Sequence, residues 1–309
     1  MPKIQLLYAV AAIIAAGAAT IALGNGYSGS LAMWVAIAAI GASSLRFVML
    51  IGELNFAVAA FYGIGAYAAG VGATIFELPF AVSLLLSGLL AGAVSVVFGF
   101  CTLQTRGPYF LLVGFAFTEV MRIIYTKSDW LGGNSGMVGI FPPEIFDAHF
   151  AVFVVLFAGI VILALYLFEC SQFGKLLRAV RDNENVVRAV GIPVHWVKIA
   201  CLAIACFAAG LAGGLSAYVN NVISPLDFGF LLSTFILAYL KVGGEDHPLG
   251  PVAGSALLIL LGSWSMSMGG SEPIFYGASI VIALLVLPKG LLGLLRRSAK
   301  TAGGQRPVA

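Results

Sequence analysis

Long, nearly uncharged apolar runs recur along the whole chain, and they limit its fold more than any other feature. Most are about 20 residues long, which is what a helix needs to cross the hydrocarbon core of a bilayer. The runs are continuous rather than alternating, so the strands of a membrane barrel are not indicated. Ten spans are predicted, at residues 4–23, 31–50, 55–76, 80–103, 108–125, 150–169, 197–220, 227–241, 249–268 and 273–290. We therefore expect an all-α, polytopic membrane protein.

The charge content supports this assignment. Only 9% of the 309 residues are charged and 61% are hydrophobic, whereas soluble domains carry about 25% charged residues. Most of the surface must therefore face lipid. Two predicted spans remain ambiguous, because 55–76 is rich in Gly and Ala and 227–241 is short. Either segment could be a full span, or it could be broken or re-entrant.

Basic residues set the orientation of the spans, because Lys and Arg concentrate in short cytoplasmic loops. The loop at 170–198 carries Lys175, Arg178, Arg181, Arg188 and Lys198. The loop at 126–149 has Lys127 as its only Lys or Arg, so we expect the first loop inside and the second outside. With ten spans, both termini then lie in the cytoplasm.

We expect one transmembrane domain at residues 1–297 and a disordered cytoplasmic tail at 298–309, which is polar and contains Gly and Pro. The first apolar run follows Lys3 and resembles a signal peptide, but its length of about 20 residues favours a retained span. The sequence has no GxxxxGK[ST] loop, HExxH helix or nucleophile elbow, and its His and Cys residues lack metal-ligand spacing. We predict no catalytic, cofactor or metal site and no nucleic-acid partner.

The inside loop at 170–197, called the coupling loop below, is predicted to form two short helices. Asp182 or Asn183 can cap the second helix, and Glu184 is favourable in its first turn. Gly191 suits a left-handed C-terminal position, and Pro193 prevents continuation. A capped helix between two spans is typical of a docking element for a cytoplasmic partner. A helix lying on anionic lipid is the alternative. The apolar face expected to need a partner comprises Val186, Val187 and Val190.

Short motifs over residues 45–295 match those of one known family in both order and spacing. They lie at 60–67, 105–110, 117–122, 132–137, 174–193, 208–215, 223–225, 250–254 and 287–291. The chain resembles the branched-chain amino-acid class of ABC permeases, the LivH/LivM family, and within it the LivM type. Departures from the family pattern occur at 53–59 and 243–249.

The resemblance implies a permease in a bacterial inner membrane that pairs with a second, related permease subunit. It also implies two cytoplasmic ATP-binding subunits and a periplasmic solute-binding protein, with no cofactor in this chain. By similarity, the helix at 182–191 would sit in a cleft of one ATP-binding subunit. The residues expected to couple to it are Arg178, Arg181, Asp182, Glu184, Val187, Arg188 and Gly191.

The implied cargo is a branched-chain or other amino acid. The departure at 53–59 leaves urea, short amides and small carboxylates open as cargo. An ion-driven secondary transporter is a further alternative, although most acidic residues fall at span ends rather than at the bilayer midplane. A channel is the remaining alternative, and uptake of solute against its concentration gradient would exclude it.

Polar residues within spans are candidates for the translocation path. Glu119 and Arg122 share a helix face at spacing i, i+3, which suits either a path lining or a structural ion pair. A pair between Arg46 and Glu53 is expected at the inner boundary. The glycines of the third span could break the helix or let its neighbours pack closely. The path candidates are Glu119, Arg122, Gly63, Gly65, Tyr67 and Asn55.

Overall fold

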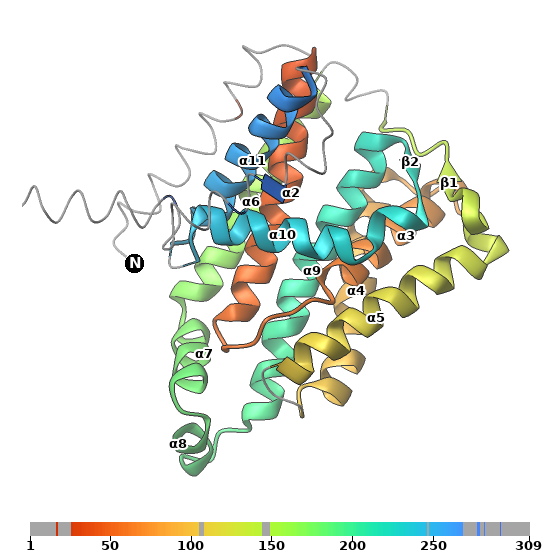
Figure 1. Ribbon diagram of the computed structural model, residues 1–309. Helices are drawn as coiled ribbons and strands as arrows, with labels where there is room; N and C mark the ends of the chain where they lie inside the picture. Colours follow the sequence, from red (N-terminus) through yellow and green to blue (C-terminus); the bar gives the residue numbers. More distant parts are fainter. Residues whose placement is uncertain are drawn as a thin grey trace, which may run out of the picture.

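The computed structural model describes residues 26–104, 108–143, 149–245 and 247–267, together with the single residues 17, 277, 278, 281 and 291. The expected span at 4–23 and the tail at 298–309 lie outside these residues, apart from Gly17, as does nearly all of the span at 273–290. Figure 1 shows a bundle of helices. Their bounds are α2 Tyr27–Met49, α3 Val58–Thr74, α4 Phe80–Thr102, α5 Pro108–Lys127, α6 Phe150–Cys170, α7 Gln172–Asp182, α8 Glu184–Ala189, α9 Val194–Asn220, α10 Phe230–Gly243 and α11 Gly250–Ser267.

Five of these helices, α2, α4, α5, α6 and α9, are long and apolar enough to cross a membrane. Three shorter apolar helices accompany them, at Val58–Thr74, Phe230–Gly243 and Gly250–Trp264. The 14 residues of α10 cover only about 21 Å at 1.5 Å per residue, whereas the hydrocarbon core is about 30 Å thick. An all-α membrane fold is confirmed, and the segment at 227–241 forms a helix too short to span alone.

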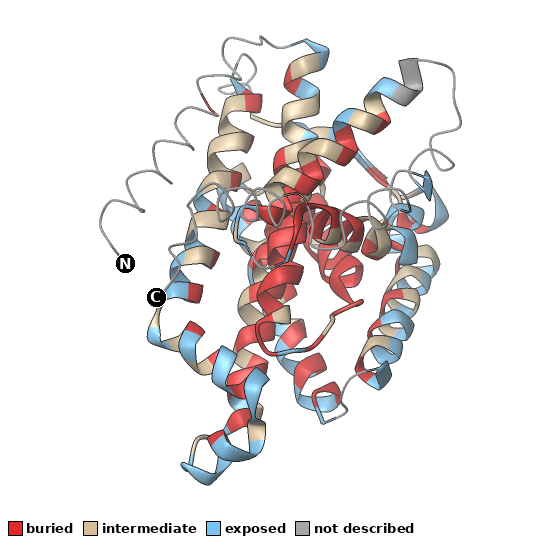
Figure 2. Ribbon diagram, turned by 60° about the vertical axis from the view of Figure 1, so that its left-hand side comes forward, coloured by how far each residue is buried: buried red, intermediate tan, exposed pale blue. Residues whose placement is uncertain are grey.

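The α9 helix forms the centre of the bundle, where Figure 2 shows the greatest concentration of buried residues. It is the most buried of the five long helices, and α5 is the least buried. Small residues allow α3 to lie directly against α9: a Cβ added to Gly65 would stand 2.1 Å from the carbonyl oxygen of Gly210. The helix α3 runs without interruption through its glycines. These glycines therefore serve close packing, not a helix break.

The chain is non-helical just before α3, at residues 50–57 between α2 and α3. Asn55 and Phe56 in this connection are buried. The carbonyl oxygen of Phe56 accepts hydrogen bonds from Thr118 Oγ1 of α5 at 3.1 Å and from Ser233 Oγ of α10 at 2.7 Å. Thr118 lies near the middle of α5. Non-helical backbone is tolerated at membrane depth only where protein groups satisfy it in this way.

The coupling loop and the paired strands lie in well-separated parts of the protein. In Figure 1, α7 and α8 lie at the bottom, and β1 and β2 lie at the upper right. Strand β1, Met137–Val138, pairs with β2, Val222–Ile223, in antiparallel register. This pairing ties the loop at 126–149 to the α9–α10 turn. The described residues of the same two connections also form the 3₁₀ helices η1 Asp129–Leu131, η2 Gly133–Ser135 and η4 Pro225–Phe228.

Candidate functional site: the coupling loop and the polar groups of the spans

The coupling loop forms the two helices predicted for it, α7 and α8. The side chain of Asn183 caps α8, accepting hydrogen bonds from the backbone N–H groups of Asn185 at 3.1 Å and Val186 at 3.2 Å. Gly191 follows α8 with φ +87°, and its N–H donates to the carbonyl oxygen of Arg188 at 3.0 Å. The next helix, α9, begins immediately after Pro193. The caps inferred from the sequence are confirmed.

The exposure of α7 and α8 divides the predicted coupling residues into two groups. Those that are exposed are Arg178, Arg181, Asp182, Arg188 and Gly191. Val187 is 7% exposed and packs against the bundle, so the prediction that it belongs to the outward apolar face is wrong. Val186 and Val190 are 58% and 74% exposed and form that face. Glu184 is half-buried.

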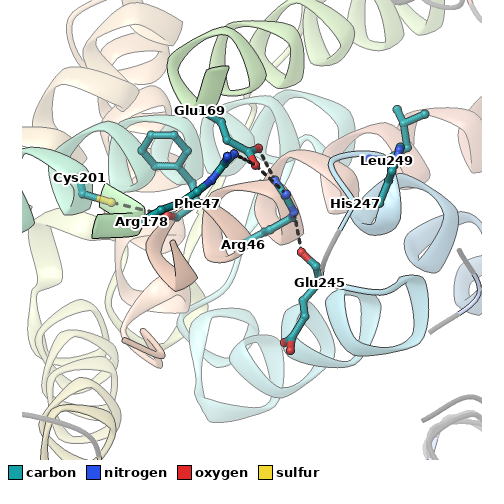
Figure 3. A network of polar contacts seen from close by, with 8 residues as sticks. All are labelled: Arg46, Phe47, Glu169, Arg178, Cys201, Glu245, His247 and Leu249. Atoms are coloured by element: carbon teal, nitrogen blue, oxygen red, sulfur yellow. Dashed lines mark hydrogen bonds and ion pairs between the residues drawn. The ribbon is translucent and has the colours of Figure 1, made fainter. Parts of the chain in front are cut away.

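An ion-pair cluster, buried at Arg46 and Glu169, fixes α7 to the membrane helices (Figure 3). Arg46, in the last turn of α2, donates from both Nη atoms to the Glu169 carboxylate of α6, at 2.6 and 3.0 Å. Arg178 of α7 donates to the same carboxylate at 2.9 Å. The Nε of Arg46 also donates to the carbonyl oxygen of Glu245. One carboxylate thus joins α2, α6 and α7.

The expected pair between Arg46 and Glu53 is not formed, because Arg46 faces α6 instead. The chain turns at Gly52, which has φ +81°, and Glu53 beyond this turn faces α9. There Lys198 Nζ lies 3.6 Å from Glu53 Oε1 and 3.2 Å from Glu184 Oε2 of α8. Glu184 also accepts from Arg188 at 2.7 Å. Lys198 is only 4% exposed.

Glu119 and Arg122 form the ion pair that their spacing predicts, with 2.7 Å between Oε2 and Nε. Both side chains are about one-third exposed and do not lie in the bundle interior. The other carboxylate oxygen of Glu119 accepts from the N–H of Phe230, the first residue of α10, at 3.4 Å. Phe115 and Phe230 pack edge to face beside the pair, with centroids 5.2 Å apart. Here α5 carries charge on a face that this chain leaves partly uncovered.

The other path candidates are buried inside this chain. Tyr67 stacks on Tyr125 with ring centroids 4.2 Å apart, and a Cβ on Gly63 would meet Tyr125 and Phe228. The side-chain oxygen of Asn55 accepts from the N–H of Ala57 at 3.0 Å, and Gly65 lies against α9. Of the six candidates, only Glu119 and Arg122 reach the surface of the chain as the structure describes it. 

The turn at η4 carries Asp227, an acidic residue with a shifted pKa, close to the cluster of Tyr67, Tyr125 and Phe228. Partial burial raises the pKa of the Asp227 carboxyl above its usual value, and a backbone hydrogen bond at Ser224 opposes the shift. Asp227 precedes Phe228, whose ring packs against Tyr62 and Tyr67 of α3 with centroids 6.1 and 5.9 Å apart. Within the described ranges, no group of three His, Cys, Asp or Glu residues is arranged to hold a metal ion.

Sequence reasoning assigned no place in the site to Lys198, used only to orient the spans, or to Glu169. The sequence does carry a signal for them, since each is a charged residue placed inside a predicted span, at its cytoplasmic end. Such charges are expensive unless paired. The sequence does not reveal their partners, which come from helices distant along the chain.

A sequence model of the family described as "Branched-chain amino acid transport system / permease component" matches residues 27–287, a stretch that includes α2 to α11. The chain belongs to this family. Members are permease components of transport systems, so this permease is a transport subunit and not an enzyme. Its helices accordingly sit in a membrane, which they cross more than once.

Curated relatives of this permease are similar to it over most of its length. LivM, a high-affinity branched-chain amino acid permease protein of Salmonella typhimurium, is 27% identical over 84% of this chain and 68% of its own. The Escherichia coli LivM is 27% identical over 83% and 68%. A probable LivM of Methanocaldococcus jannaschii is 25% identical over 68% and 67%.

Proposed function

We propose that this permease carries branched-chain amino acids through the bacterial inner membrane as one subunit of an ATP-driven importer. It assembles with a second permease of the same class, two cytoplasmic ATP-binding subunits and a periplasmic solute-binding protein. No cofactor is needed in this chain. The names of the relatives support the cargo, and the projecting, capped helix α8 is the single structural observation that supports docking of an ATP-binding subunit.

In this proposal the domain at 1–297 has ten spans, with α10 crossing together with the connections that flank it. Both termini and the coupling loop lie in the cytoplasm, and the loop at 126–149 lies outside. The tail at 298–309 is a disordered cytoplasmic extension. Two observations support the orientation. The exposed arginines of α7 and α8 lie at one end of the bundle, and the paired strands β1 and β2 lie toward the other. Basic loops remain on the cytoplasmic side.

The docking surface comprises the exposed charges Arg181, Asp182 and Arg188 with the apolar pair Val186 and Val190. Glu184, Arg178 and Val187 hold α7 and α8 to the bundle, and Gly191 ends α8. ATP-driven closure of the ATP-binding subunits then moves α7 and α8 together with the helices to which their ion pairs bind them.

The translocation path is assigned to the partly uncovered face of α5 at Glu119 and Arg122, where the second permease subunit would close it. A charged pair flanked by Phe115 and Phe230 suits a zwitterion with an apolar side chain, because charge and hydrocarbon meet at one place. Gly63, Gly65, Tyr67 and Asn55 support this face from behind through close packing.

Uptake by the reconstituted complex tests the proposal. Proteoliposomes containing this permease, its sister permease and both ATP-binding subunits should accumulate labelled leucine only with ATP inside and binding protein outside. Competition with unlabelled valine, urea, acetamide and benzoate identifies the cargo class, and only the amino acid should compete. Competition by urea or benzoate alone would reassign the cargo, and ATP-independent uptake would indicate an ion-driven transporter.

A further inference from the structure

The connection between α2 and α3, residues 50–57, lies directly against the coupling loop. A Cβ added to Gly52 would stand 3.4 Å from Cγ of Arg181 in α7. One residue further on, Glu53 meets Lys198 at 3.6 Å. Just before the connection, Arg46 shares the Glu169 carboxylate with Arg178 of α7. Contacts on both sides of the connection therefore lead to the coupling helices.

Among these contacts, Lys198 links two separate parts of the chain. Its ammonium lies 3.2 Å from Glu184, the first residue of α8, and 3.6 Å from Glu53 in the connection. The side chains of Lys198, Glu53 and Glu184 are 5%, 7% and 14% exposed. Shielding from water makes such interactions stronger and less sensitive to salt than surface pairs.

The same connection continues into the middle of the bundle. Two residues after Glu53, Asn55 folds back on the N–H of Ala57. Phe56 then accepts hydrogen bonds from Thr118 and Ser233. Thr118 lies one residue before Glu119 on α5, and Ser233 lies in the first turn of α10, whose N-terminus Glu119 contacts. A continuous chain of contacts thus joins α8 to the charged face of α5.

We propose that Lys198 and Glu53 are positioning residues that transmit the movement of α8 to residues 50–57, and through Phe56 to α5 and α10. The proposal rests on the proposed function, since it needs an ATP-binding subunit to move α8. Non-helical backbone suits the role, because its two flexible dihedral angles per residue absorb a displacement that a helix would resist. The Lys198 ammonium lies between the carboxylates of Glu53 and Glu184, so a displacement of Glu184 with α8 changes its contact with Glu53.

The experiment compares Glu53→Gln, Lys198→Met and the double variant in the full complex, reconstituted with binding protein. The measured quantity is solute taken up per ATP hydrolysed, normalised to assembled complex. Each single variant should lower this ratio about fivefold or more, the lower range of a typical coupling between sites. The double variant should be no worse than the poorer single variant, because both changes remove the same interaction.

Glu53→Gln is the decisive variant, because Lys198 keeps Glu184 as its partner and the side-chain volume hardly changes. It tests the proposal even if Lys198→Met prevents folding by removing the buried cation between Glu53 and Glu184. Lys241→Gln is the matched control, since it breaks an ion pair with Glu245 whose side chains are 38% and 41% exposed. The control should retain the wild-type ratio.

A wild-type ratio in Glu53→Gln, or losses that add in the double variant, would overturn the proposal. Loss of the ATP-binding subunits from purified Glu53→Gln would also overturn it, because the pair would then serve docking alone. Failure of the proposed function gives a different result: the wild-type complex itself would contain no ATP-binding subunits or would transport without ATP.

Discussion

The guanidinium of Arg46 donates two hydrogen bonds, of 2.6 and 3.0 Å, to the carboxylate of Glu169, and both side chains are less than 10% exposed. Fork-on-fork geometry of this kind adds orientation to the ionic attraction. The same carboxylate binds Arg178 of α7. A movement of the coupling loop therefore acts directly on the ends of α2 and α6.

Replacement of Glu169 by Gln should destabilise the protein strongly. The neutral amide leaves Arg46 buried without its counter-charge, and breaking a buried pair in this way costs about 3–5 kcal/mol. We expect a clearly lower melting temperature of the purified protein in detergent. Lys241→Gln is the control, because exposed pairs contribute only about 0–1 kcal/mol. Equal melting temperatures for the two variants would contradict this account.

Gly65→Ala should prevent the close approach of α3 and α9. The added methyl group would stand 2.1 Å from the backbone oxygen of Gly210, and neither helix backbone can yield by that amount. Overpacking costs about 1–3 kcal/mol even where neighbours can shift, so we expect little monodisperse protein after solubilisation. The matched change Gly92→Ala meets its nearest atom at 3.6 Å and should be tolerated. A full yield of Gly65→Ala would show that the helices are not in contact there.

Gly191→Pro should uncouple transport from ATP hydrolysis without affecting membrane insertion. Proline fixes φ near −65°, whereas Gly191 has φ +87°, and proline also loses the N–H donated to Arg188. The end of α8 must then rearrange. Gly191→Asn is the control, because asparagine adopts left-handed backbone more readily than other side chains. Charge reversal at Arg181 should uncouple in the same way. Normal coupled uptake by both Gly191→Pro and the Arg181 variant would argue against docking through α8.

Glu119→Gln should reduce uptake several-fold with little effect on stability. The Glu119–Arg122 pair is one-third exposed, so its contribution to folding is about 1 kcal/mol or less, whereas a solute in the path would meet it directly. Uptake and melting temperature should be measured on the same preparation, with Glu245→Gln as the control. If uptake falls only in proportion to the loss of folded protein, the pair is structural and does not line the path.

Local patterns in the sequence were sufficient to predict the long helices and the coupling loop. Run lengths locate α2, α4, α5, α6 and α9, and the caps at Asn183 and Gly191 follow from residue type alone. Non-local contacts could not be predicted. The partner of Arg46 lies 123 positions away. The non-helical segment at 50–57 precedes the glycine-rich helix α3, and Thr118 and Ser233 satisfy the backbone carbonyl of Phe56 within it.

The orientation of a short helix was also beyond prediction. With six residues, α8 has too few turns for its apolar pattern to define a single inward face, and Val186, Val187 and Val190 are equivalent by composition. Only the tertiary structure separates buried Val187 from exposed Val186 and Val190. The proposed translocation path could not be predicted from the sequence of one chain for a similar reason, because in the proposal a second permease subunit closes it.

Copurification from native membranes tests the central claim, that an importer's ATP-binding subunits dock on α8, most directly. The wild-type permease should bring down two ATP-binding subunits and a second permease, identified by mass spectrometry. The double variant Val186→Asp with Val190→Asp should retain the second permease and lose the ATP-binding subunits, since Val186 on α8 and Val190 directly after it are both exposed. Recovery of the wild-type chain alone, or ATP-binding subunits retained in full by the double variant, would contradict the account.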